Sequence, residues 1–264
     1  MSAPFTQRGE SCGPMLQSLW DYVRSEHDSV LLSPYLPVLC AFLTHVTFCA
    51  PFLLLDLLAG VSQRVRAWKI SAKQPPPPLR AWLKCLGKIA VQYLTVLLPA
   101  SALLQISRRP SQLPEWSPSS WRLFTDVFVC FLLFDALFFF WHLCLHRIPW
   151  LYRNVHQEHH QHQVPFALQA QDASTSELLS LLLLAQISAC LVNCHPVSEV
   201  FFHIFNTWLA VDDHCGYNLP WALHRLLPFF GGVPHHHIHH RRHNVNFAPY
   251  FTHWDHLFGT YRRD

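Results

Sequence analysis

Three stretches of this chain stay apolar over the length of a membrane-spanning helix, at residues 36–58, 89–106 and 123–145. About 20 largely apolar residues are enough for a helix to cross the hydrocarbon core of a bilayer. Charged residues make up 13% of the chain, whereas about a quarter is usual in soluble domains. The sequence therefore predicts an all-α fold, a multi-spanning membrane helical bundle in which residues 1–264 form a single integral-membrane domain.

Two further apolar runs, about Leu178 to Val192 and Val197 to Val211, are short for single spans. The intervening residues 193–196, Asn-Cys-His-Pro, favour a turn that interrupts a helix. We therefore expect residues 178–211 to form a helical hairpin.

Loop charge predicts the orientation in the membrane. No acidic residue lies between Leu57 and Ile106, and positive loops stay on the cytoplasmic side. A cytosolic first loop puts the end of the third span, and everything that follows the hairpin, on the cytosolic face. The net charge of +3 is too small and too scattered to predict a nucleic-acid partner. The basic residues of the first loop are Arg64, Arg66, Lys69, Lys73, Arg80, Lys84 and Lys88.

Histidine is the unusual residue of this sequence, because 18 of its 20 copies lie between His142 and His256. Side chains at i and i+4 share one face of a helix, so short histidine boxes can present neighbouring imidazoles. Such boxes occur in residues 142–160 and again in residues 212–260, which we predict to form the catalytic region and a helical cap. The candidate ligands are His142, His146, His156, His159, His160, His214, His236, His239 and His240, with Asn218 as a possible oxygen ligand.

Nine or ten candidate ligands exceed what one ion needs, since a structural zinc takes about four. The sequence therefore predicts a pair of metal ions in the cap. A nitrogen-rich shell without thiolates suits iron, zinc, copper or nickel. The H-E-x-x-H motif of hydrolytic zinc sites is absent, and oxygen chemistry on a lipid would require a redox metal such as iron. His27 and His45 lie far from the boxes and are expected to be ordinary polar residues. Seven further histidines that fit no box are expected either to be structural or to support the ligands, namely His162, His195, His203, His224, His243, His253 and His256.

Ligand histidines usually hold their second ring nitrogen against a carboxylate or a carbonyl. Asp135 lies seven residues before His142 on the same face of an apolar span, where a carboxylate is costly and tends to be functional. We expect Asp135 to orient a ligand in this way, with Asp213 and Asp255 as weaker candidates. Glu158 is expected to be solvated.

These motifs resemble those of the fatty acid hydroxylase (sterol desaturase) superfamily of membrane di-iron enzymes. The likeness runs from about Phe124 to the C-terminus. Two departures stand out: His237 occupies a position where the family usually has Asp, and Cys215 one where Ser or Thr is common. The segments that carry the resemblance are WHLCLHRIPWLYRNVHQEHHQ (141–161), DHCGYNLPW (213–221), HHHIHH (235–240), NFAPYFTHWD (246–255) and FGT (258–260).

The resemblance implies an enzyme of the endoplasmic reticulum membrane, and the loop charges put its active site on the cytosolic face. It implies an O2-dependent monooxygenase that holds two iron ions on the nine histidines and hydroxylates a sterol, with cholesterol at C25, giving 25-hydroxycholesterol, as the first expectation. Electrons from NAD(P)H would arrive through a separate reductase or a cytochrome b5-type donor, since the chain has no G-x-G-x-x-G motif and no haem or flavin signature.

Two alternatives stay open at this point, and so does the oligomeric state. The same chemistry serves other oxidases and desaturases of sterols or fatty acyl chains, which the boxes alone do not separate. A membrane metal-binding or transport protein would belong to a different class. Transport sites generally lie near mid-membrane, whereas the histidine boxes here lie at the ends of spans and in loops.

Overall fold

The structure is a computed structural model that describes residues 14–108 and 113–263. Within these residues the regular structure is helical, with no β-strand beyond two isolated bridges. In chain order the helices are α1 (Pro14–Glu26), α2 (Asp28–Leu31), α3 (Leu36–Ala59), α4 (Gln63–Arg66), α5 (Leu79–Gln92), η1 (Tyr93–Leu97), α6 (Leu98–Arg108), α7 (Ser120–Arg147), α8 (Pro149–Leu151), η2 (Tyr152–His156), η3 (His159–Gln161), η4 (Ala167–Gln171), α9 (Thr175–Val192), α10 (Pro196–His214), α11 (Leu223–Leu226), α12 (Gly232–Arg242) and α13 (His253–Leu257).

Four helical segments are long and apolar enough to cross a membrane: Leu36–Ala59, Leu79–Leu104, Ser120–Arg147 and Thr175–Val192. The predicted all-α, multi-spanning bundle is thereby confirmed. The helix that contains the predicted second span begins ten residues before it, at Leu79. The extension contains charged residues, so an uninterrupted apolar stretch does not reveal it. Lys88 lies within the helix and pairs with Glu158, 2.6 Å away, and with Asp172.

The second span carries a wide turn of π-helix at Tyr93–Leu97, just before Pro99. Proline has no N–H to donate, and its ring clashes with the carbonyl four residues earlier in an α-helix. A π-helical turn lets the backbone widen around such a residue. The helix therefore continues through the proline instead of ending there.

Residues 178–211, expected to form a helical hairpin, lie in α9 and α10, which are joined at residues 193–195. The expectation that the first of these two runs is short for a single span is wrong, because α9 (Thr175–Val192) is long and apolar enough to cross a membrane. Asn193 ends α9 in the left-handed conformation, at φ 54°. His195 accepts the Val197 N–H through Nδ1 at the start of α10, and Pro196 occupies the first turn. The two helices diverge from this turn, and α7 packs against both of them.

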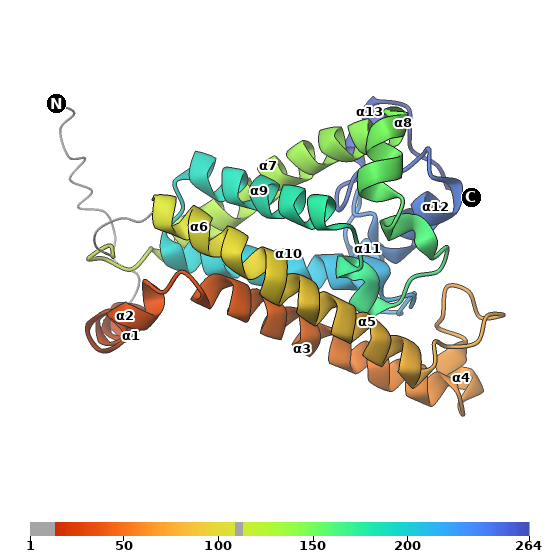
Figure 1. The fold of residues 1–264 in the computed structure, drawn as a ribbon, viewed down its shortest axis with the longest axis horizontal. Helices are drawn as coiled ribbons and strands as arrows, with labels where there is room; N and C mark the ends of the chain where they lie inside the picture. The colour runs from red at the N-terminus through yellow and green to blue at the C-terminus, as the bar shows by residue number, and fades with distance from the viewer. Residues whose placement is uncertain (1–13, 109–112, 264) are drawn as a thin grey trace.

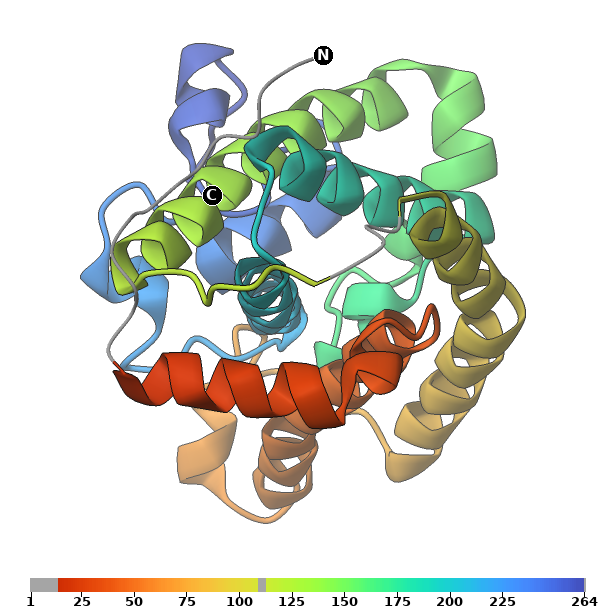
Figure 2. The same ribbon diagram turned by 90° about the vertical axis from the view of Figure 1, so that its left-hand side faces the viewer.

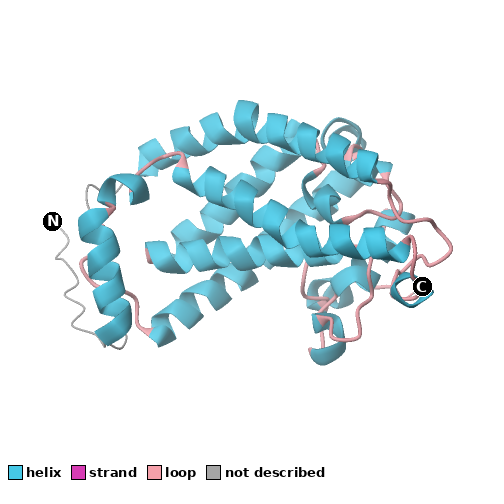
Figure 3. Cartoon of the chain, turned by 90° about the horizontal axis from the view of Figure 1, so that it is seen from below, coloured by secondary structure: helices cyan, strands magenta, loops and turns pink. Residues whose placement is uncertain are grey.

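The two ends of the bundle differ (Figure 1). At one end α1 lies across the long helices, as the views of Figures 2 and 3 both show. At the other end the helices α4, α8, α11, α12 and α13 gather with their loops.

A buried network joins the first loop to this second end. The Asp56 carboxylate accepts hydrogen bonds from Lys69 Nζ at 2.8 Å, Tyr217 Oη at 2.7 Å and Trp82 Nε1 at 3.2 Å. The Ile70 N–H also donates to the carbonyl of Gly216 at 3.0 Å. The basic first loop and the histidine-bearing segments therefore lie at the same end of the molecule.

Candidate metal centre

Two segments deliver the first histidine boxes. His142 and His146 lie one turn apart near the C-terminal end of α7. The chain reverses at Pro149 and makes a π-helical turn that ends at His156, followed by the 3-10 turn that contains His159 and His160. The wide π turn aims His156 back at the end of α7, so that its ring lies 4.8 Å from that of His142.

The remaining boxes come from α10 and α12. His214 is the last residue of α10, and α12 presents His236, His239 and His240. Helix α12 begins at Gly232, which has a φ of 58°. A Cβ there would come within 2.6 Å of the His224 ring, so glycine is required both for its conformation and for space.

The first cluster, here the five-histidine group, consists of His142, His146, His156, His160 and His239. His160 Nε2 lies 3.0 Å from His156 Nε2, 3.2 Å from His146 Nε2 and 3.1 Å from His239 Nε2. His142 Nε2 is 3.0 Å from His156 Nε2. Residues from three separate stretches of chain thus aim the same ring atom at one point.

The second cluster, here the four-histidine group, consists of His159, His214, His236 and His240. His214 Nε2 lies 3.2 Å from His159 Nε2 and 2.9 Å from His236 Nε2. His240 Nε2 is 3.0 Å from His236 Nε2. Neighbouring residues His159 and His160 belong to different groups, which places the two groups side by side.

Hydrogen bonds to Nδ1 fix the tautomer of five of these rings. A neutral imidazole that donates through Nδ1 carries its lone pair on Nε2, the atom that would bind a metal. The acceptors are Phe247 O for His142 at 2.7 Å, Glu177 Oε1 for His156 at 2.8 Å, Ala210 O for His214 at 2.8 Å, Val245 O for His239 at 2.8 Å and His162 O for His240 at 3.1 Å.

This arrangement fits metal ions. Two nitrogens bound at about 2.1 Å lie about 3.0 Å apart when they subtend a right angle at the ion and about 3.4 Å apart in a tetrahedron. The Nε2 separations of 2.9–3.2 Å lie around the right-angle value and below the tetrahedral one. Lone pairs that face one another across such distances repel unless a cation lies between them. Each group therefore has the donor set and the spacing to hold one ion.

Burial keeps these imidazoles neutral. Desolvation lowers the pKa of His214 to about 4. Desolvation, reinforced by the neighbouring histidines, lowers the pKa of His156, His236 and His240 well below the ordinary value. Because only neutral imidazole can bind a metal, the groups are ready to act as ligands at physiological pH.

Comparison with known proteins places this centre in a family. The model of the fatty acid hydroxylase family matches residues 127–260, a segment that contains all nine histidines. The chain belongs to the fatty acid hydroxylase family. The resemblance inferred from the histidine boxes is thereby confirmed, and no solved structure matches the chain significantly.

Several curated proteins of similar sequence extend the comparison. The chain is 45% identical to cholesterol 25-hydroxylase of Homo sapiens over 249 residues, which cover 94% of this chain and 90% of the relative. It is 42% identical to a cholesterol 25-hydroxylase-like protein of Danio rerio over 247 residues, covering 93% and 97%. It is 33% identical to methylsterol monooxygenase erg25A of Aspergillus fumigatus over 224 residues, covering 80% and 71%.

Among the predicted site residues of this fatty acid hydroxylase family member, Asn218 is the one whose side-chain oxygen is engaged by residues outside the nine histidines. Its Oδ1 accepts hydrogen bonds from Arg225 Nε at 3.1 Å and Nη2 at 2.8 Å, and it lies 3.1 Å from His224 Nε2. The Arg225 guanidinium occupies the lone pairs of Asn218 Oδ1, and its positive charge would repel a metal cation. The ligand set proposed below therefore omits Asn218.

Among the described residues, the two predicted orienting carboxylates, Asp135 and Asp213, make no hydrogen bond to a ligand ring. Asp135 Oδ1 instead accepts the backbone N–H groups of Tyr250 and Phe251, both at 3.0 Å, so it holds the loop that follows α12. Asp213 is buried beside the histidines, but its Oδ1 has no hydrogen-bond partner among the described residues. The backbone carbonyl of Ala210 takes the role expected of Asp213 toward His214.

Two other carboxylates support the centre. Glu177, in the first turn of α9, contacts His156 directly and is only 4% exposed. Asp255 accepts the N–H groups of Phe247 at 2.8 Å and Ala248 at 2.9 Å, and it pairs with His235 Nε2 at 3.1 Å. The Phe247 carbonyl in turn accepts the hydrogen bond of His142 Nδ1, so Asp255 positions the ligand His142 indirectly.

A long cavity of about 850 Å³ ends at the metal centre. Histidines of both groups line this end, among them His142, His156, His214 and His236. The rest of the wall is mostly apolar and comes from α1, α3, α6, α7, α9 and α10. An apolar ligand of considerable length would thus reach the histidines from the interior of the bundle.

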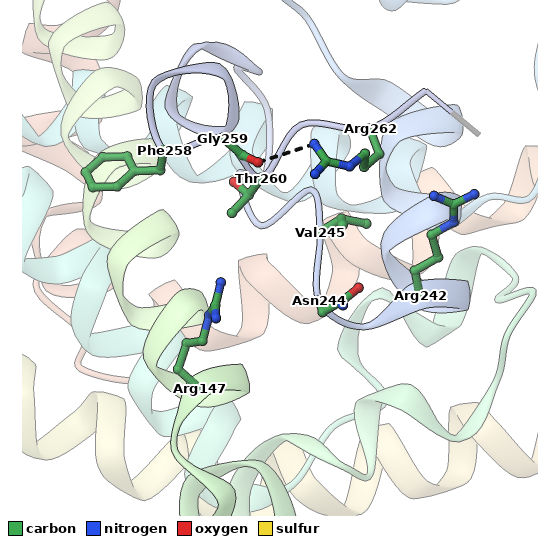
Figure 4. A pocket seen from close by; sticks show the side chains of 8 residues that line it. All are labelled: Arg147, Arg242, Asn244, Val245, Phe258, Gly259, Thr260 and Arg262. Carbon is green, nitrogen blue, oxygen red and sulfur yellow. Dashed lines mark hydrogen bonds between the residues drawn. The ribbon is translucent and has the colours of Figure 1, made fainter.

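A smaller pocket of about 510 Å³ lies on the outside of the same end (Figure 4). Arg147, Arg242 and Arg262 line it together with Val245. The carbonyl of Val245 accepts His239 Nδ1, so one wall of this basic pocket is a single hydrogen bond away from a ring of the five-histidine group.

Proposed function

We propose that the chain is an O2-dependent membrane monooxygenase that hydroxylates a sterol, with cholesterol as substrate and C25 as the oxidised carbon. The observation that carries the proposal is an apolar cavity that ends at nine converging imidazole nitrogens, in a chain 45% identical to a cholesterol 25-hydroxylase. A sterol is barely soluble in water, so a cavity among membrane helices suits its delivery.

We propose that each histidine group holds one iron ion, giving a di-iron centre on His142, His146, His156, His159, His160, His214, His236, His239 and His240. When bound, such redox ions supply the activation of O2 that attack on an unactivated C–H bond requires. The chain's own residues hold five of the nine ligands in one tautomer through Nδ1 hydrogen bonds. The apolar cavity walls exclude water and position the reacting carbon.

Electrons must come from outside, and we propose a reductase or a cytochrome b5-type donor, supplied by NAD(P)H, that docks at the histidine end. Two features support this location: the basic first loop, and the arginine-lined pocket beside Val245. Both carry the charge that an acidic protein surface would complement.

We propose that the chain resides in the endoplasmic reticulum membrane with the metal centre on its cytosolic face. The basic residues of the first loop favour the cytosol for the end of the bundle that they share with the histidines. The histidine groups lie at one end of the bundle, whereas the site of a metal transporter would lie near mid-membrane. Their position therefore also favours an enzyme.

The proposal is tested with full-length protein purified in lipid nanodiscs that contain cholesterol. The protein is supplied with ferrous iron, a reductase system and ¹⁸O2, and the products are analysed by mass spectrometry. We expect 25-hydroxycholesterol that carries one ¹⁸O atom. A product oxidised at another carbon would redirect the proposal to a different reaction of the same family, and the absence of any oxygenated sterol would refute it.

His160→Ala supplies the matched negative control, because the His160 Nε2 atom lies 3.0–3.2 Å from three other Nε2 atoms of its group. This variant should insert into the membrane normally and form no product. Retained turnover would remove His160 from the centre.

A further inference from the structure

The long cavity is apolar along most of its length, yet polar side chains line its wall far from the histidines. Gln186 lies in the middle of the apolar helix α9 and is only 7% exposed. Its Nε2 lies 3.4 Å from His203 Nε2 on α10, and His203 lies 3.8 Å from the Glu199 carboxylate. All three residues line the cavity. Polar groups at membrane depth are costly, so such a cluster points to a function.

We propose that Gln186 and His203 bind the ring hydroxyl of the sterol, at the end of the molecule opposite to the carbon that is oxidised. This inference rests on the sterol substrate proposed above. A hydroxyl group both donates and accepts a hydrogen bond, and an amide and an imidazole each offer a donor and an acceptor.

Helix geometry sets the separation between this cluster and the metal centre. His203 lies eleven residues before His214 on α10, which corresponds to about 16 Å along the helix at 1.5 Å per residue. On α9, Gln186 lies nine residues after Glu177, the partner of His156, or about 14 Å. These lengths approach the distance from the ring hydroxyl of an extended sterol to the end of its side chain. A sterol held at the cluster therefore presents its side chain, and not its rings, to the histidines.

The direction of the cavity also agrees with how a sterol lies in a bilayer. The α9–α10 turn lies at the end of the bundle that α1 covers (Figure 1), and along both helices the cluster lies between that turn and the metal centre. A sterol of that leaflet already points its hydroxyl toward this surface and its side chain toward the membrane interior. It can enter the cavity without turning over.

Another polar residue on the cavity wall is committed to the protein itself. Asn206 lies one turn after His203 and lines the same cavity, but its Oδ1 accepts a hydrogen bond from Tyr250 Oη at 2.8 Å. Asn206 is therefore not included in the proposed site.

The test compares binding of cholesterol with binding of cholest-5-ene, which lacks the hydroxyl, in competition against radiolabelled cholesterol on the full-length protein in detergent. Wild-type protein should prefer cholesterol by about tenfold, the value of one or two net hydrogen bonds. Gln186→Leu and His203→Phe should each reduce the preference to about threefold or less, with the affinity for cholest-5-ene unchanged. Partition of each sterol into micelles is the same for every variant, so the change in preference reports on the protein.

Ser188→Ala is the matched control, because Ser188 is buried on the same helix, donates to Leu184 O at 2.9 Å and does not line the cavity. It should keep the wild-type preference. If the two cluster variants lose thermal stability but keep the tenfold preference, the cluster is structural and the inference is wrong. If wild-type protein oxidises cholesterol but both variants prefer cholesterol over cholest-5-ene as strongly as the wild type does, only this inference fails and the proposed function stands. If wild-type protein binds neither sterol saturably, the proposed function fails with it.

Discussion

Replacing Glu177 with glutamine should weaken metal binding by the five-histidine group about tenfold. Glu177 Oε1 accepts His156 Nδ1–H at 2.8 Å, and its second oxygen has no hydrogen-bond partner among the described residues. Hydrogen bonds to charged groups contribute about 1.5–3 kcal/mol, against about 1 kcal/mol for neutral pairs. Losing the charge thus removes about 0.5–2 kcal/mol of support for His156, or roughly two- to thirtyfold in affinity.

Glu177→Ala should have a larger effect, because it removes the acceptor as well as the charge. Loss of such an outer partner typically costs 10–100-fold in metal affinity. The assay is equilibrium dialysis of the full-length protein against a graded metal chelator, with retained metal measured by mass spectrometry. Circular dichroism of each variant verifies that the helices persist.

Glu158→Gln makes the same chemical change one residue from His159. The Glu158 carboxylate pairs with Lys88 Nζ at 2.6 Å, and no described contact joins it to a ligand ring. This variant should hold metal as the wild type does. The reasoning is refuted if both Glu177 variants retain metal normally, or if Glu158→Gln loses as much metal as Glu177→Gln.

Three further changes test other parts of the structure. Asp56→Ala should destabilise the protein by about 3–5 kcal/mol, because it leaves the Lys69 ammonium buried without its carboxylate; an unchanged thermal midpoint in detergent would contradict this. Burial raises the pKa of Asp255, but the hydrogen bonds it accepts outweigh burial and lower the pKa. Its stabilisation should therefore be present above about pH 3.8 and be lost as the pH falls through the lower folded-state value, and Asp255→Asn should cost roughly 1.5–3 kcal/mol at neutral pH. Thermal unfolding at several pH values measures both effects, and equal stability of variant and wild type at neutral pH would exclude the assigned role. Asn218→Ala should leave the metal content unchanged, whereas His214→Ala should reduce it; equal losses would return Asn218 to the ligand set.

The sequence was most informative where chemistry and helical spacing coincide. His142 and His146 lie one turn apart on a helix, and the H-x-x-H-H pattern recurs at His236, His239 and His240, so these residues could be predicted to share a site. Imidazoles are rare in apolar chains, and their clustering left few other interpretations. The family match is consistent with this reading.

The partners of the ligands could not be found in the same way. Asp135 lies on the same helix face as His142, but the loop from Tyr250 to Phe251, distant in sequence, occupies its carboxylate. Glu177 lies at the start of an apolar run, where no spacing signal connects it to His156. Backbone carbonyls such as Phe247 O and Ala210 O have no side-chain signature at all.

The start of the second span could not be predicted from the sequence either. Lys84 and Lys88 interrupt the apolar pattern that defines a span, yet the helix runs through them from Leu79. Lys88 is tolerated because Glu158 and Asp172 pair with it, a tertiary contact that the local sequence does not encode.

The metal content of the purified wild-type chain tests the central claim most directly. Nine imidazole nitrogens arranged as a group of five and a group of four should hold about two iron ions per chain, each group supplying at least the three or four ligands that a protein-bound ion takes. Plasma mass spectrometry of full-length protein, loaded with ferrous iron and then freed of loosely bound metal, should find close to two. A single tightly held zinc, or no retained metal, would contradict the account.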